Sequence, residues 1–287
     1  EPDAKLDPFY FDDDFVSFAC DYPITPAKIN GVWHLIQLSG KATSLEKFEP
    51  IVNQFIERMN EPLLSKQNGK FGYTDMFGNE VIPFVYTDAD WFTGLFAKVT
   101  INNMKGLINT DNTLAIPIIY DEITEIAEGA SYKVKRGGKE FEVDTYGNLA
   151  TPTAVTANDY GKVGYIWQGR PFIDCKFDFV TEFLRGFALV NLGGIQQPDG
   201  NIQGGKWGVI SYAGDYIIEP TYDELAFFTN GIIRAKNNQG WGLINLQNEI
   251  VLPFEYTEIS AVGDSFGTAK KNEVEFTINK FGKIVER

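Results

Sequence analysis

The residues with the widest chemical range in this chain are its histidine and its cysteines, and they are few. The sequence contains one histidine, His34, and two cysteines, Cys20 and Cys175, which lie far apart. A structural zinc site needs a full set of Cys and His ligands, and a Ser-His-Asp triad needs a nucleophile beside its histidine. No motif provides either arrangement, so we interpret His34 as structural. We interpret the cysteines as two buried thiols, with one long-range disulfide as the alternative.

Carboxylates are abundant, but their spacing predicts no site. Aspartate and glutamate number 39 against 25 lysines and arginines, which gives a formal net charge of −14. Residues 12–14 are consecutive aspartates without the alternating ligands of a calcium loop, so we interpret them as a solvated acidic face. No pair of acids is singled out for glycoside hydrolysis. The sequence therefore predicts no catalytic, metal-binding or cofactor-binding residue, and without a basic cluster nucleic acid is not an expected partner.

Two glycine-lysine segments have some likeness to phosphate-binding loops. Residues 137–139 and 204–206 both read Gly-Gly-Lys, but neither has the Gly-Lys-Ser/Thr spacing that a phosphate loop requires. We interpret both segments as hairpin turns that lead into a strand.

A repeated pattern of strands and turns accounts for most of the remaining sequence. The segments around Gly208 and Gly242 share the order Trp-Gly, then two aliphatic residues before a proline, then a tyrosine. These two glycines are 34 residues apart, and the same spacing separates Gly72 from Gly106. Further units have His34, Phe141, Gly164 and Phe276 at the equivalent position. The pattern predicts an array of about eight tandem units.

This pattern resembles the WG-repeat family, whose units read approximately Gly-Lys-Trp-Gly-Val-Ile-Asp, followed by Ile-Ile-Pro and Tyr-Asp. The resemblance covers most of residues 31–287, although tryptophan fills its position only at Trp33, Trp207 and Trp241. It implies a bacterial interaction or envelope module, and it implies no catalytic residues.

Each unit is expected to be an antiparallel meander of about three strands. Gly214 should supply the positive φ of a hairpin, and Pro220 should end a strand because proline cannot donate to a central ladder. The same role is expected for Pro83, Pro117 and Pro253. The strand that contains Trp207 carries apolar residues on both faces, so neighbouring units must cover both. We therefore expect an all-β fold in which Trp207 and Trp241 are buried.

The array departs from regular spacing in several places. A capping box at Thr43 and apolar residues at helical spacing predict one short N-terminal helical insertion over residues 43–60. The unit at Phe141 lacks its second half, and residues 193–200 form a loop insertion. We interpret residues 1–30 as a half-repeat or cap. Residues 31–287 are predicted to be a single domain of tandem antiparallel hairpin or meander repeats, arranged as an open β-superhelix or a propeller-like array.

Partner binding is expected where the repeat is irregular, because strand positions are committed to holding neighbouring units together. The candidate residues are side chains of the inserted loop: Ile195, Gln196, Gln197, Pro198 and Asn201. The helical insertion is a second irregular segment. The leading hypothesis is a non-catalytic repeat scaffold for protein–protein interaction, with an unknown protein as the partner.

Two alternatives remain. An envelope glycan-binding module would bind polysaccharide on exposed aromatic side chains, for which the candidates are Trp91, Trp167, Tyr86, Tyr120, Tyr222 and Tyr256. Burial of these side chains in the core is the simpler interpretation, because the tyrosines recur at the repeat period. A carboxylate-based hydrolase is the least favoured alternative.

The expected location is the bacterial cell envelope. The sequence has no apolar run long enough to span a bilayer, and it opens with Glu1 rather than methionine. We interpret this start as a mature or trimmed N-terminus of a secreted protein or lipoprotein. Export to the periplasm or the cell surface is therefore expected, and a cytoplasmic location is the alternative.

Overall fold

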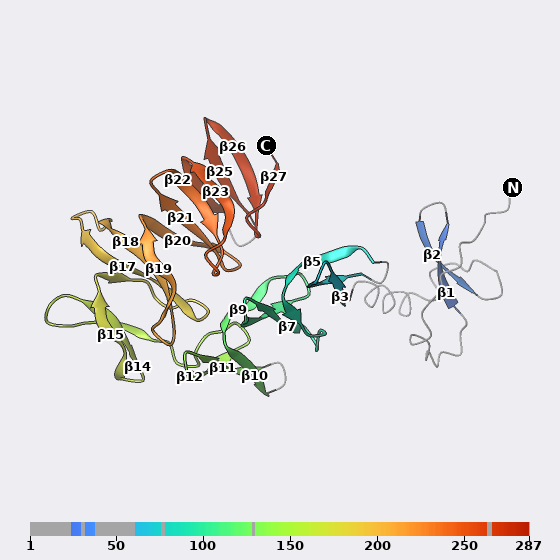
Figure 1. The fold of residues 1–287 in the computed structure, drawn as a ribbon, viewed down its shortest axis with the longest axis horizontal. Coiled ribbons are helices and arrows are strands. Elements are labelled where there is room, and N and C mark those ends of the chain that lie inside the picture. Colours follow the sequence, from blue (N-terminus) through green and yellow to red (C-terminus); the bar gives the residue numbers. More distant parts are fainter. Residues whose placement is uncertain are drawn as a thin grey trace. The chain divides into compact units, whose positions relative to one another are not determined.

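A computed structural model describes the chain over most of its length, and every regular element in the described part is a β-strand (Figure 1). The chain divides into two compact units, Glu1–Glu61 and Pro62–Arg287. No helix among the described residues is long and apolar enough to cross a membrane. The described residues are 24–29, 32–37, 61–75, 78–127, 130–262 and 266–286.

The first unit contains one described hairpin. Strand β1 (Ile24–Ile29) pairs antiparallel with β2 (Val32–Gln37), and His34 lies opposite Ala27 in this ladder. Strand β1 falls in the segment interpreted as a half-repeat or cap. Cys20, the acidic run at residues 12–14 and the helix predicted over residues 43–60 lie outside the described residues.

The second unit consists of antiparallel meanders in which strands that are consecutive in the chain are hydrogen-bonded neighbours. Sheets of three described strands are formed by β3 (Leu63–Gln67), β4 (Lys70–Thr74) and β5 (Glu80–Tyr86), by β10 (Glu122–Ala127), β11 (Ser131–Arg136) and β12 (Lys139–Asp144), and by β13 (Ala154–Ala157), β14 (Val163–Trp167) and β15 (Arg170–Phe177). Sheets of four strands are formed by β6 (Asp88–Ala89), β7 (Phe96–Ile101), β8 (Met104–Asn109) and β9 (Leu114–Tyr120), by β16 (Phe179–Val180), β17 (Phe187–Gln196), β18 (Ile202–Ser211) and β19 (Tyr216–Tyr222), by β20 (Glu224–Thr229), β21 (Ile232–Asn237), β22 (Gly240–Ile244) and β23 (Ile250–Tyr256), and by β24 (Glu258–Val262), β25 (Phe266–Lys271), β26 (Val274–Asn279) and β27 (Ile284–Glu286).

The predicted all-β class and the repeated meander are confirmed. The meander is longer than the expected three strands in the four-stranded sheets, because the segment that follows Tyr-Asp also pairs. Residues Glu224–Thr229, for example, form β20 and pair with β21. The tyrosine therefore ends one sheet and the next sheet begins two residues later.

Close approach between two backbones explains the glycine of the Trp-Gly pair. Trp207 pairs with Tyr222 and Val209 pairs with Ile218, so Gly208 alone faces residues 219–221 of β19. This bulge draws the β19 backbone over Gly208, where an added Cβ would lie 2.6 Å from the Ile218 carbonyl oxygen. No side chain fits in that space.

The prolines were predicted to end their strands, and that prediction is wrong. Pro220 lies inside β19, in the bulge opposite Gly208, and the strand continues to Tyr222. A proline is tolerated there because β19 is the edge strand of its sheet and the bulge interrupts the ladder. The equivalent prolines Pro83, Pro117 and Pro253 lie inside β5, β9 and β23 in the same way.

A recurring turn joins the third and fourth strands of the repeats. In the turn that follows β22, the Asn245 side chain accepts hydrogen bonds from the backbone N–H groups of Gln247 (3.0 Å) and Glu249 (2.9 Å). Asn248 has a φ of 60°, in the left-handed region that Asn and Gly tolerate. Gly214 takes the same position after β18 with a φ of 84°, as the sequence predicted.

The tyrosine of one repeat is bonded to this turn in the next repeat. The hydroxyl of Tyr86 donates to Asn112 Oδ1 at 2.6 Å, and the hydroxyl of Tyr222 donates to Asn248 Oδ1 at 2.7 Å. For Tyr120 the corresponding turn residue is Gly147, which has no side chain to accept the bond. The Tyr120 hydroxyl is buried without a hydrogen-bond partner among the described residues, and burial raises its pKa.

The unit at Phe141 has lost the fourth strand, as the sequence indicated, and Phe141 fills the freed space. Phe141 pairs with Val134, the register position that Gly208 takes opposite Val190. With no bulged strand across it, the position accepts a large side chain. Phe141 is buried, and its ring centroid lies 5.8 Å from that of Tyr212.

The prediction that the tryptophans are buried needs correction, because Trp207 and Trp241 are only half-buried. Each indole packs on apolar core residues. The Trp241 ring also lies near two cations, the Arg234 guanidinium at 4.8 Å and the Lys236 ammonium at 5.4 Å from the ring centroid. These tryptophans join the core to a polar surface.

We predict that Gly208→Ala lowers the free energy of unfolding by about 1–3 kcal/mol, because the new methyl group would overpack against backbone that cannot move away as a flexible side chain would. Urea unfolding followed by circular dichroism measures the change. Gly214→Asn is the matched control, since Asn248 occupies the same turn position in the next repeat. An equal loss in both variants would contradict the role assigned to the backbone contact.

We predict that Tyr86→Phe destabilises the protein by about 1–2 kcal/mol, because it leaves the Asn112 amide oxygen without its donor. Tyr120→Phe should cost much less, since the Tyr120 hydroxyl has no described partner to lose. Both side chains are buried, so the pair isolates the hydrogen bond. Thermal and urea unfolding of the two variants provide the comparison, and a larger loss for Tyr120→Phe would refute it.

Candidate functional site

The longest hairpin of the described chain projects from its sheet. Strands β17 and β18 pair from Phe187 and Ser211 out to Gln196 and Ile202. Beyond Leu192, neither strand has a second neighbour among the described strands, because β16 pairs only with Asn191 and Val190 and β19 begins to pair at Trp207. We call residues 193–205 the arm.

The structure corrects two expectations here. Residues 193–200 were predicted to be a loop, but they form one strand and the tip of an ordered hairpin. Residues 204–206 were predicted to be a turn, but they lie within β18. The Gly-Gly-Lys segment at residues 137–139 does contain the predicted turn, with φ values of 55° at Gly137 and 77° at Gly138.

A buried asparagine and a half-buried ion pair fix the base of the arm. Asn191, which has no exposed surface, accepts a hydrogen bond from the Gly194 N–H (2.9 Å) and donates one to the Gly204 carbonyl (3.4 Å). The Asp178 carboxylate accepts a bond from the Gly193 N–H (2.7 Å) and pairs with Lys162 (2.6 Å). Burial opposes ionisation of Asp178, but these bonds outweigh it and lower its pKa. The arm therefore leaves the sheet in a defined direction.

The sequence-predicted binding residues all lie on the outer part of the arm. Ile195 is 67% exposed, which is unusual for isoleucine and leaves an apolar side chain available to a partner. Of the other four candidates Gln197 is half-buried, and the exposed ones are Gln196, Pro198 and Asn201. The structure brings the five residues onto one hairpin, and their role in binding stays a prediction.

A compact turn orders the tip of the arm. The Gln197 N–H donates to the Asn201 carbonyl (2.8 Å), and Asn201 donates to the Asp199 carboxylate from its backbone (3.0 Å) and its side chain (2.8 Å). The backbone bond and then the side-chain bond from Asn201 lower the pKa of Asp199. The tip is thus held by its own hydrogen bonds.

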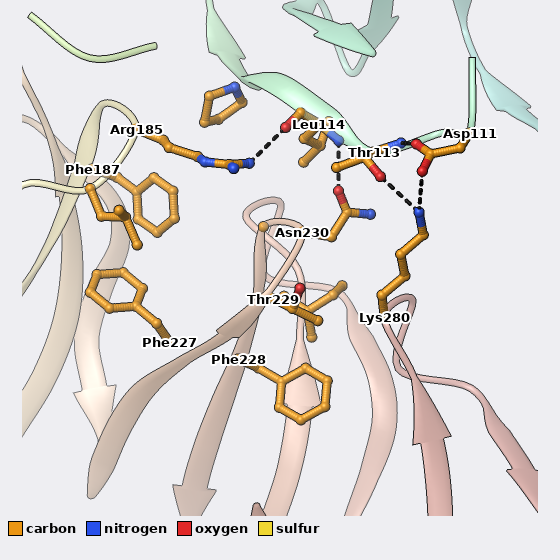
Figure 2. A pocket seen from close by; sticks show the side chains of 14 residues that line it. Asp111, Thr113, Leu114, Arg185, Phe187, Phe227, Phe228, Thr229, Asn230 and Lys280 are labelled. Atoms are coloured by element: carbon orange, nitrogen blue, oxygen red, sulfur yellow. Dashed lines mark hydrogen bonds and ion pairs between the residues drawn. The ribbon is translucent and has the colours of Figure 1, made fainter. Parts of the chain in front are cut away.

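A second candidate site is a cavity of about 430 Å³ lined by residues of four sheets of the second unit (Figure 2). On one wall the Lys280 ammonium lies 2.8 Å from both Asp111 Oδ2 and Thr113 Oγ1. Burial opposes ionisation of Asp111, but the hydrogen bonds from Lys280 and Thr113 outweigh it and lower its pKa to about 2. Asp111 and Lys280 thus form an ion pair at neutral pH.

Leu114, the first residue of β9, carries the adjoining part of the polar lining. Its N–H donates to Asn230 Oδ1 (2.6 Å), and its carbonyl accepts a bond from Arg185 Nη1 (2.9 Å). Figure 2 shows Arg185 and Asn230 reaching Leu114 from different elements. Sequence reasoning missed this cavity, because its bonded residues are separated by 71 to 169 positions and follow no motif.

The remaining sequence candidates do not assemble into a reactive site. His34 lies in β2, and Cys175 is a half-buried free thiol 3.8 Å from the Thr156 carbonyl. Among the described residues no group of three His, Cys, Asp or Glu side chains is placed to hold a metal. Of the aromatic candidates for sugar stacking, Trp91 is 63% exposed; Trp167 and Tyr222 are half-buried, and the buried ones are Tyr86, Tyr120 and Tyr256.

A model of the WG containing repeat matches the chain at five places, which together cover more than half of it. The matched residues are 71–104, 106–139, 168–194, 207–240 and 241–274. A search of curated proteins finds no match.

Two similar solved structures are a eukaryotic initiation factor and KlHsv2 with loop 6CD replaced by a Gly-Ser linker. The first is 11% identical at a TM-score of 0.27, over 93% of this chain and 85% of that chain. The second is 9% identical at a TM-score of 0.25, over 77% of this chain and 90% of that chain. Scores this low carry no argument about the fold or the function of this chain.

We predict that Asp111→Asn lowers the free energy of unfolding by less than about 1 kcal/mol at pH 7, because the Asp111 side chain is 60% exposed and solvent screens its pairing with Lys280. The lowered pKa makes this contribution complete above about pH 4 and lost as the pH falls toward 2. The difference between wild type and variant in urea unfolding should therefore shrink over that range. Asp159→Asn, at an exposed turn position, is the control, and a pH-independent difference for Asp111→Asn would contradict the ion pair.

Proposed function

The chain belongs to the WG-containing repeat family, and we propose that it works as a non-catalytic repeat module that binds another protein through the arm. The observation that carries this proposal is that the outer edges of both strands of the arm have no hydrogen-bonded neighbour among the described strands. A free edge presents backbone N–H and C=O groups that an extended segment of a partner can pair with. We infer that the partner adds a strand to the arm.

The side chains of the arm support the same mode of binding. Paired residues of an antiparallel ladder lie on one face, so Ile195 and Gln203 share one face while Gln196 and Ile202 share the other. Each face thus offers one aliphatic side chain and one amide. A partner strand would gain backbone hydrogen bonds from the edge and specificity from these side chains.

The fixed base means that the arm is already ordered before a partner binds. The buried Asn191 and the Lys162–Asp178 pair hold the glycine-rich base in one conformation, so a partner would not have to order the hairpin itself. Less conformational entropy is then lost on association. A hairpin that only connected β17 to β18 would not need these hydrogen bonds at its base.

We propose the bacterial cell envelope as the place of action, with the periplasm or the cell surface as the compartment and the cytoplasm as the alternative. The family resemblance supports this proposal. Fractionation of cells that produce the full-length protein tests it, and recovery only in the cytoplasmic fraction would contradict it.

Glycan binding is the second candidate function, and one observation favours it. Trp91 is 63% exposed and Leu95 is 69% exposed, in the connection between β6 and β7. An exposed indole offers a flat apolar face on which a sugar ring can stack. We place this candidate second because it rests on a single exposed aromatic side chain.

We predict that replacing residues 195–203 by Asn-Gly removes capture of protein partners and leaves the melting temperature nearly unchanged, because these residues pair only with one another among the described strands. Wild type, the shortened variant and Trp91→Ala are immobilised and exposed to envelope extracts, and retained proteins are compared quantitatively. Proteins that are retained by wild type and Trp91→Ala but not by the shortened variant would support the proposal that partners bind through the arm.

Equal retention by all three proteins would contradict the proposal. The same three proteins are tested for sedimentation with insoluble envelope polysaccharide. Binding that is lost only in Trp91→Ala would transfer the function to the glycan candidate.

A further inference from the structure

The cavity where four sheets meet contains an arginine without a carboxylate partner. Arg185 makes no ion pair with a described residue, and one of its nitrogens, Nη1, donates to the Leu114 carbonyl. Lys280, the other cation of the lining, is paired with Asp111. The charged groups of the lining therefore sum to one positive charge, in a protein whose formal net charge is −14.

The backbone of Arg185 adopts a conformation that favours asparagine or glycine. Arg185 and Gly186 form the turn before β17 with φ values of 50° and 96°. The equivalent turn before β21 is Asn230-Gly231, with φ values of 50° and 73°. Asn and Gly are the residues that such turns favour, and a long side chain is less suited to positive φ. A long side chain is tolerated in such a turn, as Gln168 with a φ of 50° shows, and at Arg185 it forms part of the cavity lining.

Apolar side chains form the rest of the lining. Phe187 and Phe227 meet edge to face with their ring centroids 5.3 Å apart, and Phe228 and Leu114 lie on the same cavity. A volume of about 430 Å³ falls within the range of small-molecule sites, which combine apolar walls with a few polar groups. This cavity offers a single unpaired cation beside aromatic walls (Figure 2).

We propose that this cavity binds a small organic acid, with its carboxylate on the Arg185 guanidinium and its apolar body against Phe187 and Phe227. The planar guanidinium keeps its Nε and Nη2 donors after Nη1 bonds to Leu114, and a guanidinium can hold a carboxylate through two parallel hydrogen bonds. The ligand site is separate from the arm and does not depend on the function proposed for the arm.

Binding of 4-fluorophenylacetate and of its neutral amide, 4-fluorophenylacetamide, tests the proposal by fluorine NMR titration of the full chain. The two probes have nearly the same shape and differ in charge. The acid should bind saturably, and the amide should bind at least about tenfold more weakly, because a hydrogen bond to a charged group contributes roughly that much. Equal binding of acid and amide, or no saturable binding of the acid up to 10 mM (roughly the weakest affinity that a few such contacts would give), would overturn the proposal.

A variant locates the binding in the cavity. Arg185→Gln should weaken binding of the acid at least about tenfold, while Arg170→Gln, which removes an exposed arginine from β15, should leave it unchanged. Unfolding of each variant in urea shows whether the fold is retained. Undiminished binding by folded Arg185→Gln would overturn the proposal, and the comparison of acid with amide decides it on the wild-type protein if that variant does not fold.

Discussion

The approach of a bulged edge strand to a side-chain-free backbone is the contact on which each complete repeat depends. Gly208 and Gly242 face carbonyl oxygens at distances that leave no room for a Cβ. The residue before each glycine pairs with the tyrosine at the far side of the bulge, as Trp207 does with Tyr222. Tryptophan, glycine, proline and tyrosine therefore all belong to the same bulge. The glycine leaves room for the neighbouring strand, the proline lies in the bulge, and pairing of the two strands resumes at the tryptophan and tyrosine.

The irregular unit supports this explanation. Where the fourth strand is lacking, Phe141 takes the glycine position and turns an otherwise empty face into a core contact with Tyr212. The bond from a tyrosine to the following turn varies in a similar way. It forms where the turn residue at positive φ is Asn112, and it is lost where that residue is Gly147. Either residue satisfies the backbone, but only asparagine also joins two repeats.

Much of the scaffold could be predicted from the sequence, because the repeat period and the turn chemistry are local properties. The period located the glycine positions, and Gly214 has the predicted conformation. The role of Pro220 could not be deduced, since a bulge depends on how two strands pair and the sequence of neither strand alone indicates it. The arm is predicted to be a loop because it interrupts the repeat spacing, whereas in the structure Gly194 and Gly204 pair in register between two strands. The cavity around Arg185 depends on contacts between distant repeats, which no local pattern reports.

The resulting account separates a packed scaffold from a projecting arm that is free to bind. Native-state hydrogen exchange, resolved by residue, tests this separation most directly. The account predicts strong protection for amides of the central strands, such as Val209 and Leu243, and exchange from small local openings for amides of residues 195–203, with protection of the arm rising when a partner is bound. Protection of the arm equal to that of the central strands in the free protein would contradict it, because the arm would then be packed as part of the scaffold.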